Sequence, residues 1–257
     1  MKLKDLALLL NELAPIQYSE QWDNPGLLVG DMEKEINKVY VALDATSDVI
    51  AAAHEAGADL ILCHHPLIFK SIKRVSGDNY VGKRVMEIIR NDMALFAMHT
   101  DFDITCMGIE ASKRLDLIET KVLEPTLGEE LGLGCFGYLK EDLTLAELCE
   151  RVKSAFDIGS VIAYGDLSSV MVKVAVFPGS GSSAIDTAAI EGCDVLITGD
   201  ISHHDGIDAL EKELCIIDAG HYGIEKIFIP YMKEFLENNT EGISVIEDKA
   251  EKTFTIV

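Results

Sequence analysis

Two segments of the chain match each other without a gap, at an offset of 135 residues. Residues 39–62 read VYVALDATSDVIAAAHEAGADLIL, and residues 174–197 read VAVFPGSGSSAIDTAAIEGCDVLI. In each copy an apolar run predicts a buried strand, and an alanine-rich stretch predicts a helix that ends at Gly57 or Gly192. A second apolar run then predicts another strand. This pattern is typical of a strand–helix–strand unit with a parallel pair of strands.

The match continues past the second strand of each copy. Further helices are expected near 80–91 and 206–213, followed by third strands at 94–98 and 214–218. We therefore expect an α/β fold with two pseudo-symmetric lobes from an internal duplication, each a mixed sheet flanked by helices. The lobes would form a single domain, with lobe 1 at about residues 1–125 and lobe 2 at about residues 126–257.

The remaining segments predict connecting and outer structure. Thr144 and Glu147 form a capping box before an amphipathic helix that ends near Phe156. The glycine-rich stretch 120–140 is strand-like and is expected to cross between the lobes. A helix reaching Asn238 and edge strands at 243–246 and 253–257 complete the expected elements.

Composition narrows the possible functions. The chain has 257 residues, 48% of them hydrophobic, with 22 Lys and Arg against 44 Asp and Glu, a net charge of −22. So acidic a chain disfavours nucleic acid and anionic membrane surfaces as partners. It contains no apolar run long enough to cross a membrane. Its six scattered cysteines indicate small buried residues in a reducing compartment, so we expect a cytoplasmic protein.

Six of the seven histidines directly follow predicted strands, and only His54 lies within a predicted helix. The carboxyl ends of parallel strands meet at one edge of a sheet, where ligands bind in open α/β folds. We therefore expect the polar residues that follow these strands to gather at one edge: His64, His65, His99, Asp101, Asp103, His203, His204, His221 and Glu225. Metal binding is favoured there over a hydrogen-bonded polar network.

Imidazoles and carboxylates together suit zinc, iron, manganese, cobalt or nickel. Adjacent histidines point their rings in different directions, so the pair His64 and His65 indicates two neighbouring ions. A carboxylate that reaches both ions would bridge them, as in hydrolytic two-metal sites. The sequence thus predicts a dinuclear centre at the strand ends between the lobes. Its residual positive charge would attract a phosphate-bearing substrate.

Several motifs together resemble the Nif-three-like family, whose members are often named GTP cyclohydrolase 1 type 2 homologues. The motifs are WDNPGLLVG at 22–30, HHP at 64–66, HTDFD at 99–103, GDISHH at 199–204 and GHYGIE at 220–225. The resemblance implies two divalent ions per chain. It assigns His64 and Asp103 to one ion, His65 and His221 to the other, and Glu225 as the bridge.

The resemblance also implies roles beyond the metal ligands. His99, His203 and His204 would line the site, with His99 and His204 as catalytic proton-transfer groups. The chain resembles the short members, which lack an inserted domain, and a homohexameric toroid is implied. It departs from the family at Asp101, where asparagine is common, and at Asp200, where glutamate is common. Both departures bear on the choice of metal.

Three other features have two interpretations each. The loop 177–183 is glycine-rich and is either a phosphate cradle or a tight turn, and turn chemistry favours the latter. The loop 44–48 is interpreted as a helix N-cap, although Asp44 lies near enough to the metal edge to reach it. Trp22 is interpreted as a packing residue and not as a platform for stacking a base.

These observations favour a metal-dependent hydrolase of a small phosphorylated or nucleotide-like substrate. The resemblance names GTP as the candidate. The alternative is a ring protein that binds metal without turnover, for storage, delivery or as an adaptor for other proteins. A nucleic-acid-binding ring is disfavoured by the net charge.

Overall fold

The computed structural model describes residues 1–249, and the chain divides into two compact units. Unit 1 is Met1–Phe102 together with the segment that starts at Phe228, and unit 2 is Asp103–Ile227. These boundaries differ from the expected lobes at about 1–125 and 126–257. The difference arises because the last described strand returns to pair with the first sheet, while residues 118–127 pair within the second.

Unit 1 contains a mixed sheet in the order β1-β4-β3-β2-β11. The strands are β1 (Gly26–Val29), β2 (Lys38–Asp44), β3 (Leu60–His65), β4 (Ala94–Ala97) and β11 (Ser244–Glu247). All are parallel to their neighbours except β1, which pairs antiparallel with β4. The helices are α1 (Leu3–Leu13), α2 (Ser47–Glu55), α3 (Tyr80–Arg90), α4 (Thr100–Phe102) and α10 (Phe228–Asn239), with a 3₁₀ turn at Ile16–Tyr18.

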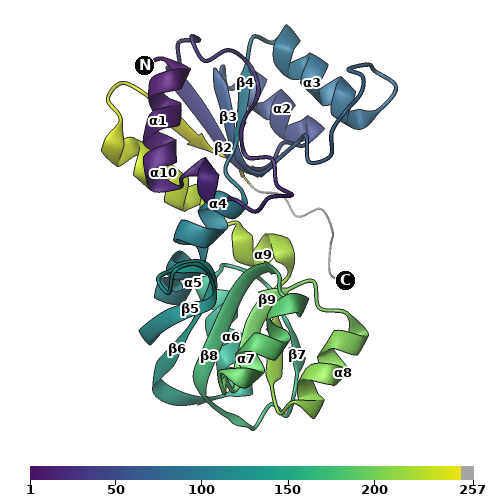
Figure 1. Cartoon of the computed structure of the whole chain (residues 1–257), viewed down its shortest axis with the longest axis vertical. Helices are drawn as coiled ribbons and strands as arrows, with labels where there is room; N and C mark the ends of the chain where they lie inside the picture. Colours follow the sequence, from purple (N-terminus) through teal and green to yellow (C-terminus); the bar gives the residue numbers. More distant parts are fainter. Residues whose placement is uncertain (250–257) are drawn as a thin grey trace. The chain divides into compact units, whose positions relative to one another are not determined.

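Helices cover both faces of this sheet, with α2 and α3 on one side and α1 and α10 on the other (Figure 1). On the α2 side, Ile61 of β3 packs in a buried cluster with Ile50 of α2 and Ile88 of α3. Because both faces are buried, the central strands are almost continuously apolar, as the sequence predicts. The polar residues of β3 are its last two, His64 and His65.

Unit 2 contains a second mixed sheet in the order β5-β6-β8-β9-β10-β7. Its strands are β5 (Ile118–Leu127), β6 (Leu131–Thr144), β7 (Ile162–Tyr164), β8 (Val170–Ser180), β9 (Val195–Gly199) and β10 (Cys215–Asp218). The helical segments are a π-helical turn at Asp103–Met107, α5 (Gly108–Arg114), α6 (Leu145–Ala155), a 3₁₀ turn at Ser182–Ala184, α7 (Ile185–Ile190), α8 (His203–Glu211) and α9 (His221–Glu225). Strands β8, β9 and β10 are parallel, and the outer pairings are antiparallel.

The two predicted strand–helix–strand units form in the structure, as β2-α2-β3 and β8-α7-β9, and both strand pairs are parallel. Contacts also recur at the offset of 135 residues. Asp59 accepts hydrogen bonds from the backbone N–H groups of residues 37 and 38, and Asp194 accepts them from those of residues 172 and 173. Gly57 and Gly192, which follow the two helices, both have a φ of +68°. A common origin of the two units stays a prediction.

Most other predicted elements are present, with one difference. The capping box of Thr144 and Glu147 starts α6, and α10 and β11 lie where the sequence predicts them. The stretch 120–140 instead forms most of a β5–β6 hairpin within the second sheet and does not cross over. The predicted strand at 253–257 lies outside the described residues.

Five cysteines are buried, Cys215 is half-buried, and all six are free thiols. Burial raises the pKa values of Cys135 and Cys193 to about 11, which disfavours thiolate chemistry. Their interpretation as small core residues agrees with this placement. Among the described residues, no helix is both long and apolar enough to span a bilayer.

Candidate metal centre

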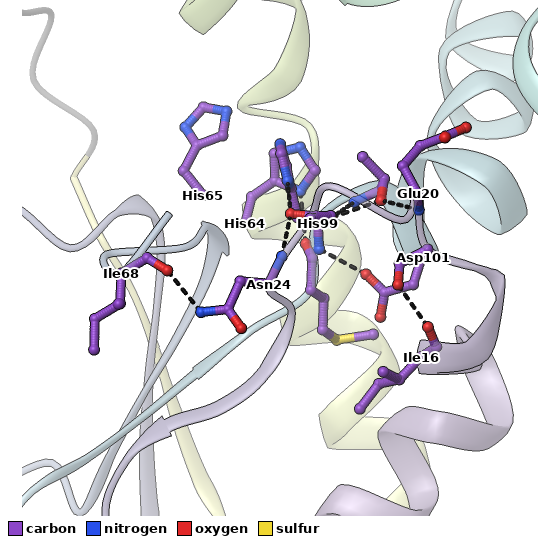
Figure 2. Close-up of polar contacts among 12 residues, drawn as sticks. Ile16, Glu20, Asn24, His64, His65, Ile68, His99 and Asp101 are labelled. Atoms are coloured by element: carbon purple, nitrogen blue, oxygen red, sulfur yellow. Dashed lines mark hydrogen bonds and ion pairs between the residues drawn. The ribbon is translucent and has the colours of Figure 1, made fainter. Parts of the chain in front are cut away.

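Three histidines gather at the carboxyl end of the first sheet. His64 and His65 end β3, and His99 follows β4, which is the parallel neighbour of β3. The His64 ring lies 4.9 Å from that of His65 and 5.2 Å from that of His99, between centroids. One nitrogen from each ring lies within 4.8 Å of the others, close enough to share a metal site (Figure 2). We call these residues the three-histidine group.

Each ring of this group has its Nδ1 atom hydrogen-bonded to an oxygen. His64 Nδ1 lies 2.7 Å from the carbonyl oxygen of Met98, and His65 Nδ1 lies 2.9 Å from Oδ1 of Asp44. His99 Nδ1 lies 2.7 Å from Oδ1 of Asp23. Carbonyl and carboxylate oxygens only accept, so each Nδ1 donates its proton and the Nε2 lone pair is presented for a ligand bond. Metal-binding histidines are oriented in this way.

Asp23 holds His99 and the segment that follows it, a role that the sequence analysis missed. Its Oδ2 atom accepts hydrogen bonds from the backbone N–H and the hydroxyl of Thr100, at 3.0 and 2.6 Å. Burial raises the pKa of this carboxyl, but the hydrogen bonds from His99 and Thr100 outweigh burial and lower the pKa to about 2. Asp23 therefore stays a carboxylate at physiological pH.

Asp44 also has a role different from the predicted one. The N-cap of α2 is Thr46, whose side chain accepts from the backbone N–H of Val49. Asp44 instead ends β2 opposite His65 and hydrogen-bonds to its ring. The N-cap interpretation of the loop is therefore correct, with Thr46 as the cap. The second interpretation, that Asp44 reaches the edge where the histidines lie, is also correct.

Asp101 is almost fully buried, with 1% of its surface exposed, and its Oδ1 accepts a hydrogen bond from the His99 backbone N–H at 2.7 Å. Burial is the main reason that the pKa of Asp101 is raised to about 6. The contact with the His99 backbone fixes the turn that carries the histidine (Figure 2). Asparagine in this position would make the same contact through its side-chain oxygen.

Unit 2 carries a second group of metal-ligand residues, Asp103, His221 and Glu225. His221 begins α9 just after β10, and its Nε2 lies 2.9 Å from Oε2 of Glu225, one helical turn later. Carboxylate oxygens of Asp103 and Glu225 lie within 4.8 Å of each other. Asp103 begins the π-helical turn, a rare geometry that often occurs at functional sites. We call these residues the Asp103–His221–Glu225 group.

Asp200 orients His221 from the end of β9. The Nδ1 atom of His221 lies 2.8 Å from Oδ2 of Asp200. Asp200 has a φ of +57°, a left-handed conformation that aspartate and asparagine tolerate better than most residues. Asp218 connects the neighbouring loops, because its carboxylate accepts from the backbone N–H groups of Ile201 and Gly220 at 3.0 and 2.8 Å. The sequence analysis did not identify Asp218.

Residues 177–183 are the last four residues of β8 followed by Gly181 and the start of the 3₁₀ turn, and Gly179 within the strand makes room for Glu225. Gly179 has a φ of +85°, and a Cβ atom added there would lie 2.6 Å from Oε1 of Glu225. The helix that follows, α7, has only six residues, too short for an anion site at its N-terminus. The favoured interpretation as a tight turn is correct only for residues 181–183, because residues 177–180 continue β8.

Other predicted residues lie differently. His203 and His204 are exposed on the first turn of α8, with ring centroids 5.5 Å apart, and they belong to neither metal-ligand group. His54 is exposed on α2. Trp22 is 59% exposed, so it is not a core residue, and its ring lies edge-on to those of Phe69 and His99.

The residues present fit divalent transition-metal ions. The donors are imidazole nitrogens and carboxylate oxygens, the ligand types that zinc, iron, manganese, cobalt and nickel accept. Four imidazoles, those of His64, His65, His99 and His221, are each oriented by an oxygen at Nδ1. Such second contacts are typical of metal-binding histidines.

Comparisons with known proteins agree over almost the whole chain. The family model Duf34/NIF3 (NGG1p interacting factor 3) matches residues 1–253. A GTP cyclohydrolase 1 type 2 homolog of Clostridium acetobutylicum is 36% identical over 241 residues, which cover 92% of this chain and 90% of that protein. A protein of the same name from Streptococcus pneumoniae is 37% identical over 246 residues, 92% of each chain.

Solved structures have the same fold. A Bacillus cereus protein related to NIF3 has a TM-score of 0.95 at 24% identity and covers 100% of this chain and 99% of its own. Reduced HcgD from Methanocaldococcus jannaschii has a TM-score of 0.84 at 31% identity, covering 96% of this chain and 97% of its own. The chain therefore belongs to the Duf34/NIF3 family.

Proposed function

We propose that the chain binds two divalent transition-metal ions per molecule. The observation that carries this proposal is the matched orientation of His64, His65 and His221, each with Nδ1 held by an oxygen acceptor. In the arrangement implied by the family resemblance, His64 and Asp103 bind one ion and His65 and His221 bind the other. Glu225 is the bridging ligand in this proposal.

The proposed activity is hydrolysis of a small phosphorylated or nucleotide-like substrate. GTP is the first candidate, because the curated relatives are named GTP cyclohydrolase 1 type 2 homologs. Bound positive ions would also let a chain with a net charge of −22 attract a phosphate-bearing molecule. When bound, two such ions supply Lewis acidity and lower the pKa of water towards neutrality.

His99 and Asp23 supply the proton-transfer chemistry in this proposal. Asp23 stays ionised because its pKa is about 2, so it holds the Nδ1 proton of His99 in place. The Nε2 atom of His99 is then the atom that accepts a proton from water and later donates it to a leaving group. His204, the other proton-transfer residue expected from the resemblance, is exposed on α8 and is a weaker candidate.

The proposal is tested by steady-state turnover of GTP and a panel of phosphate esters with the metal-loaded protein. Glu225→Gln keeps the size of the side chain but removes its charge, so turnover is expected to fall by at least about 100-fold. His54→Ala, which changes an exposed histidine on α2, is expected to leave turnover unchanged. Equal turnover by Glu225→Gln and the wild type would overturn the assignment.

Absence of any hydrolysis by a protein that retains its metal would instead support the alternative, a metal-binding ring without turnover. The homohexameric toroid implied by the resemblance is part of the same proposal. Light scattering of the purified chain at several concentrations tests it. A mass near six times 28.1 kDa is expected, and a monomer mass would contradict it.

A further inference from the structure

Trp22 and Phe69 form an exposed aromatic pair beside the three-histidine group. Their side chains are 59% and 46% exposed. Their ring centroids lie 5.8 Å apart, and the rings meet at 64°. The His99 ring lies 6.1 Å from Trp22 and 6.3 Å from Phe69. The pair therefore borders the histidines and is not part of the buried cluster on the α2 side of the sheet.

The backbone next to this pair is fixed by polar contacts on both sides of Trp22. Asp23 hydrogen-bonds to His99 and Thr100, and the backbone N–H of Glu20 donates to the Thr100 hydroxyl at 2.9 Å. Asn24 donates from Nδ2 to the carbonyl oxygen of Ile68 at 2.6 Å, which ties the Trp22 segment to the Phe69 loop (Figure 2). These hydrogen bonds fix the backbone around Trp22 and Phe69 without requiring that the two rings be buried.

The exposed surface of the pair suits a flat aromatic ligand. Aromatic faces stack on planar rings, and this attraction depends little on which ring is bound. Within residues 1–249, the indole N–H of Trp22 donates to no protein acceptor, so it is available to a polar edge of a ligand. A protein partner fits less well, because two side chains offer far less area than the roughly 800 Å² per partner of a stable interface.

We propose that Trp22 and Phe69 bind the planar heteroaromatic ring of the substrate, with Trp22 contacting one part of the ring and Phe69 another. The ring would lie next to His99, the proton-transfer residue. This inference rests on the proposed function in one respect, that the bound molecule is the substrate that is hydrolysed. Binding of the ring itself requires only the two aromatic residues, both of which belong to unit 1.

Trp22 is the only tryptophan of the chain, so its fluorescence reports on this pair alone. The test is a titration of the full chain with guanosine 5′-monophosphate and, separately, with ribose 5-phosphate, which carries the same phosphate without the ring. The proposal predicts saturable quenching by the first and at least about tenfold weaker binding of the second. Equal affinity for the two probes would overturn it.

Variants of Phe69 provide the second arm. Phe69→Ala is expected to raise the Kd for guanosine 5′-monophosphate at least about tenfold, and Phe69→Tyr to stay within about twofold of the wild type. Tyr80→Ala removes another exposed aromatic ring, 69% exposed at the start of α3, and is expected to change nothing. An unchanged Kd for Phe69→Ala would overturn the inference.

Elemental analysis of the same samples separates this inference from the proposed function. If the protein binds the ring but takes up no metal, the proposed role of Trp22 and Phe69 is supported and the proposal of a metal-dependent hydrolase is overturned. If the protein holds two metal equivalents but binds both probes equally, only the proposed role of Trp22 and Phe69 is overturned.

Discussion

Nε2 of His221 lies 2.9 Å from Oε2 of Glu225, while the other ring nitrogen of His221 lies 2.8 Å from Oδ2 of Asp200. A neutral imidazole has one N–H, so it satisfies only one of two flanking carboxylates. The second contact therefore requires one more proton, on the ring or on Glu225, or a cation bound by both Nε2 and Oε2. Nε2 and Oε2 are the atoms that the metal-binding proposal uses.

The Asp200→Asn substitution tests how much Asp200 contributes to metal binding through His221. Asparagine tolerates the left-handed backbone at this position, so the fold is expected to be retained. The loss of charge weakens the orientation and basicity of His221, and zinc affinity is expected to fall about 10- to 100-fold. Competition with a chromogenic chelator measures it. Asp208→Asn, an exposed change on α8, is the control, and equal affinities for the two variants would contradict the role of Asp200.

Gly179→Ala tests the space that the end of β8 leaves for Glu225. The new methyl group would lie 2.6 Å from Oε1 of Glu225, so the carboxylate is expected to move and metal affinity to fall at least about tenfold. Gly192→Ala is a matched control, because Gly192 also has a positive φ but a Cβ there meets nothing within 4 Å.

Both glycine variants are expected to lose about 1 kcal/mol of stability through backbone strain, measured by urea unfolding without metal. Only Gly179→Ala is expected to lose metal affinity. Parallel loss of metal affinity in both variants would show that strain, and not the position of Glu225, is responsible.

Asp23→Asn is expected to lower the free energy of unfolding by about 2 kcal/mol at neutral pH. The pKa of Asp23 is lowered from 3.8 to about 2 by its hydrogen bonds, and its side chain is 0% exposed. A lowered pKa stabilises the fold above the unfolded value, and this contribution is lost as the pH falls through the folded value. The difference between wild type and variant should therefore be constant above about pH 5 and shrink between pH 4 and pH 2.

Urea unfolding of the metal-free proteins across this pH range measures the effect. Asp208→Asn, an exposed carboxylate on α8, serves as the control and is expected to stay within about 0.5 kcal/mol of the wild type. A difference that persists unchanged at pH 2 would contradict the assignment of a strong hydrogen-bonded carboxylate to Asp23.

The sequence predicts the central strands and the positions of most histidines because both depend on local patterns. Apolar periodicity marks β2, β3, β8 and β9, and parallel strands bring their following residues to one edge. This reasoning leads correctly from His64, His65 and His99 to one group. It also leads to His203 and His204, which follow β9 but lie exposed on α8, because position after a strand does not fix the direction of a side chain.

Local sequence patterns do not identify the carboxylates that orient the histidines. Asp23 lies 76 residues before His99 in an irregular segment, and Asp44 lies 21 residues before His65. Only the packing of the chain brings these carboxylates to the rings. The exposed side chain of Trp22 was missed for a related reason, since tryptophan is usually buried and its local sequence gives no contrary signal.

The unit boundaries also depend on distant pairing. β11 is a weakly patterned strand near the end of the described chain, yet it joins β2 in parallel and takes α10 with it into unit 1. A division of the sequence at its midpoint assigns these elements to the second half. The pairing partner of an edge strand is set by the sheet that it completes, which a linear pattern does not reveal.

The most direct test of the account is elemental analysis of the gently purified wild type beside His65→Ala and His54→Ala. We predict about two equivalents of a transition metal in the wild type and in His54→Ala, and a clear loss in His65→Ala, whose ring belongs to the three-histidine group. A wild type that holds no metal and takes up none when it is added would contradict the account, because the oriented histidines would then be a polar network.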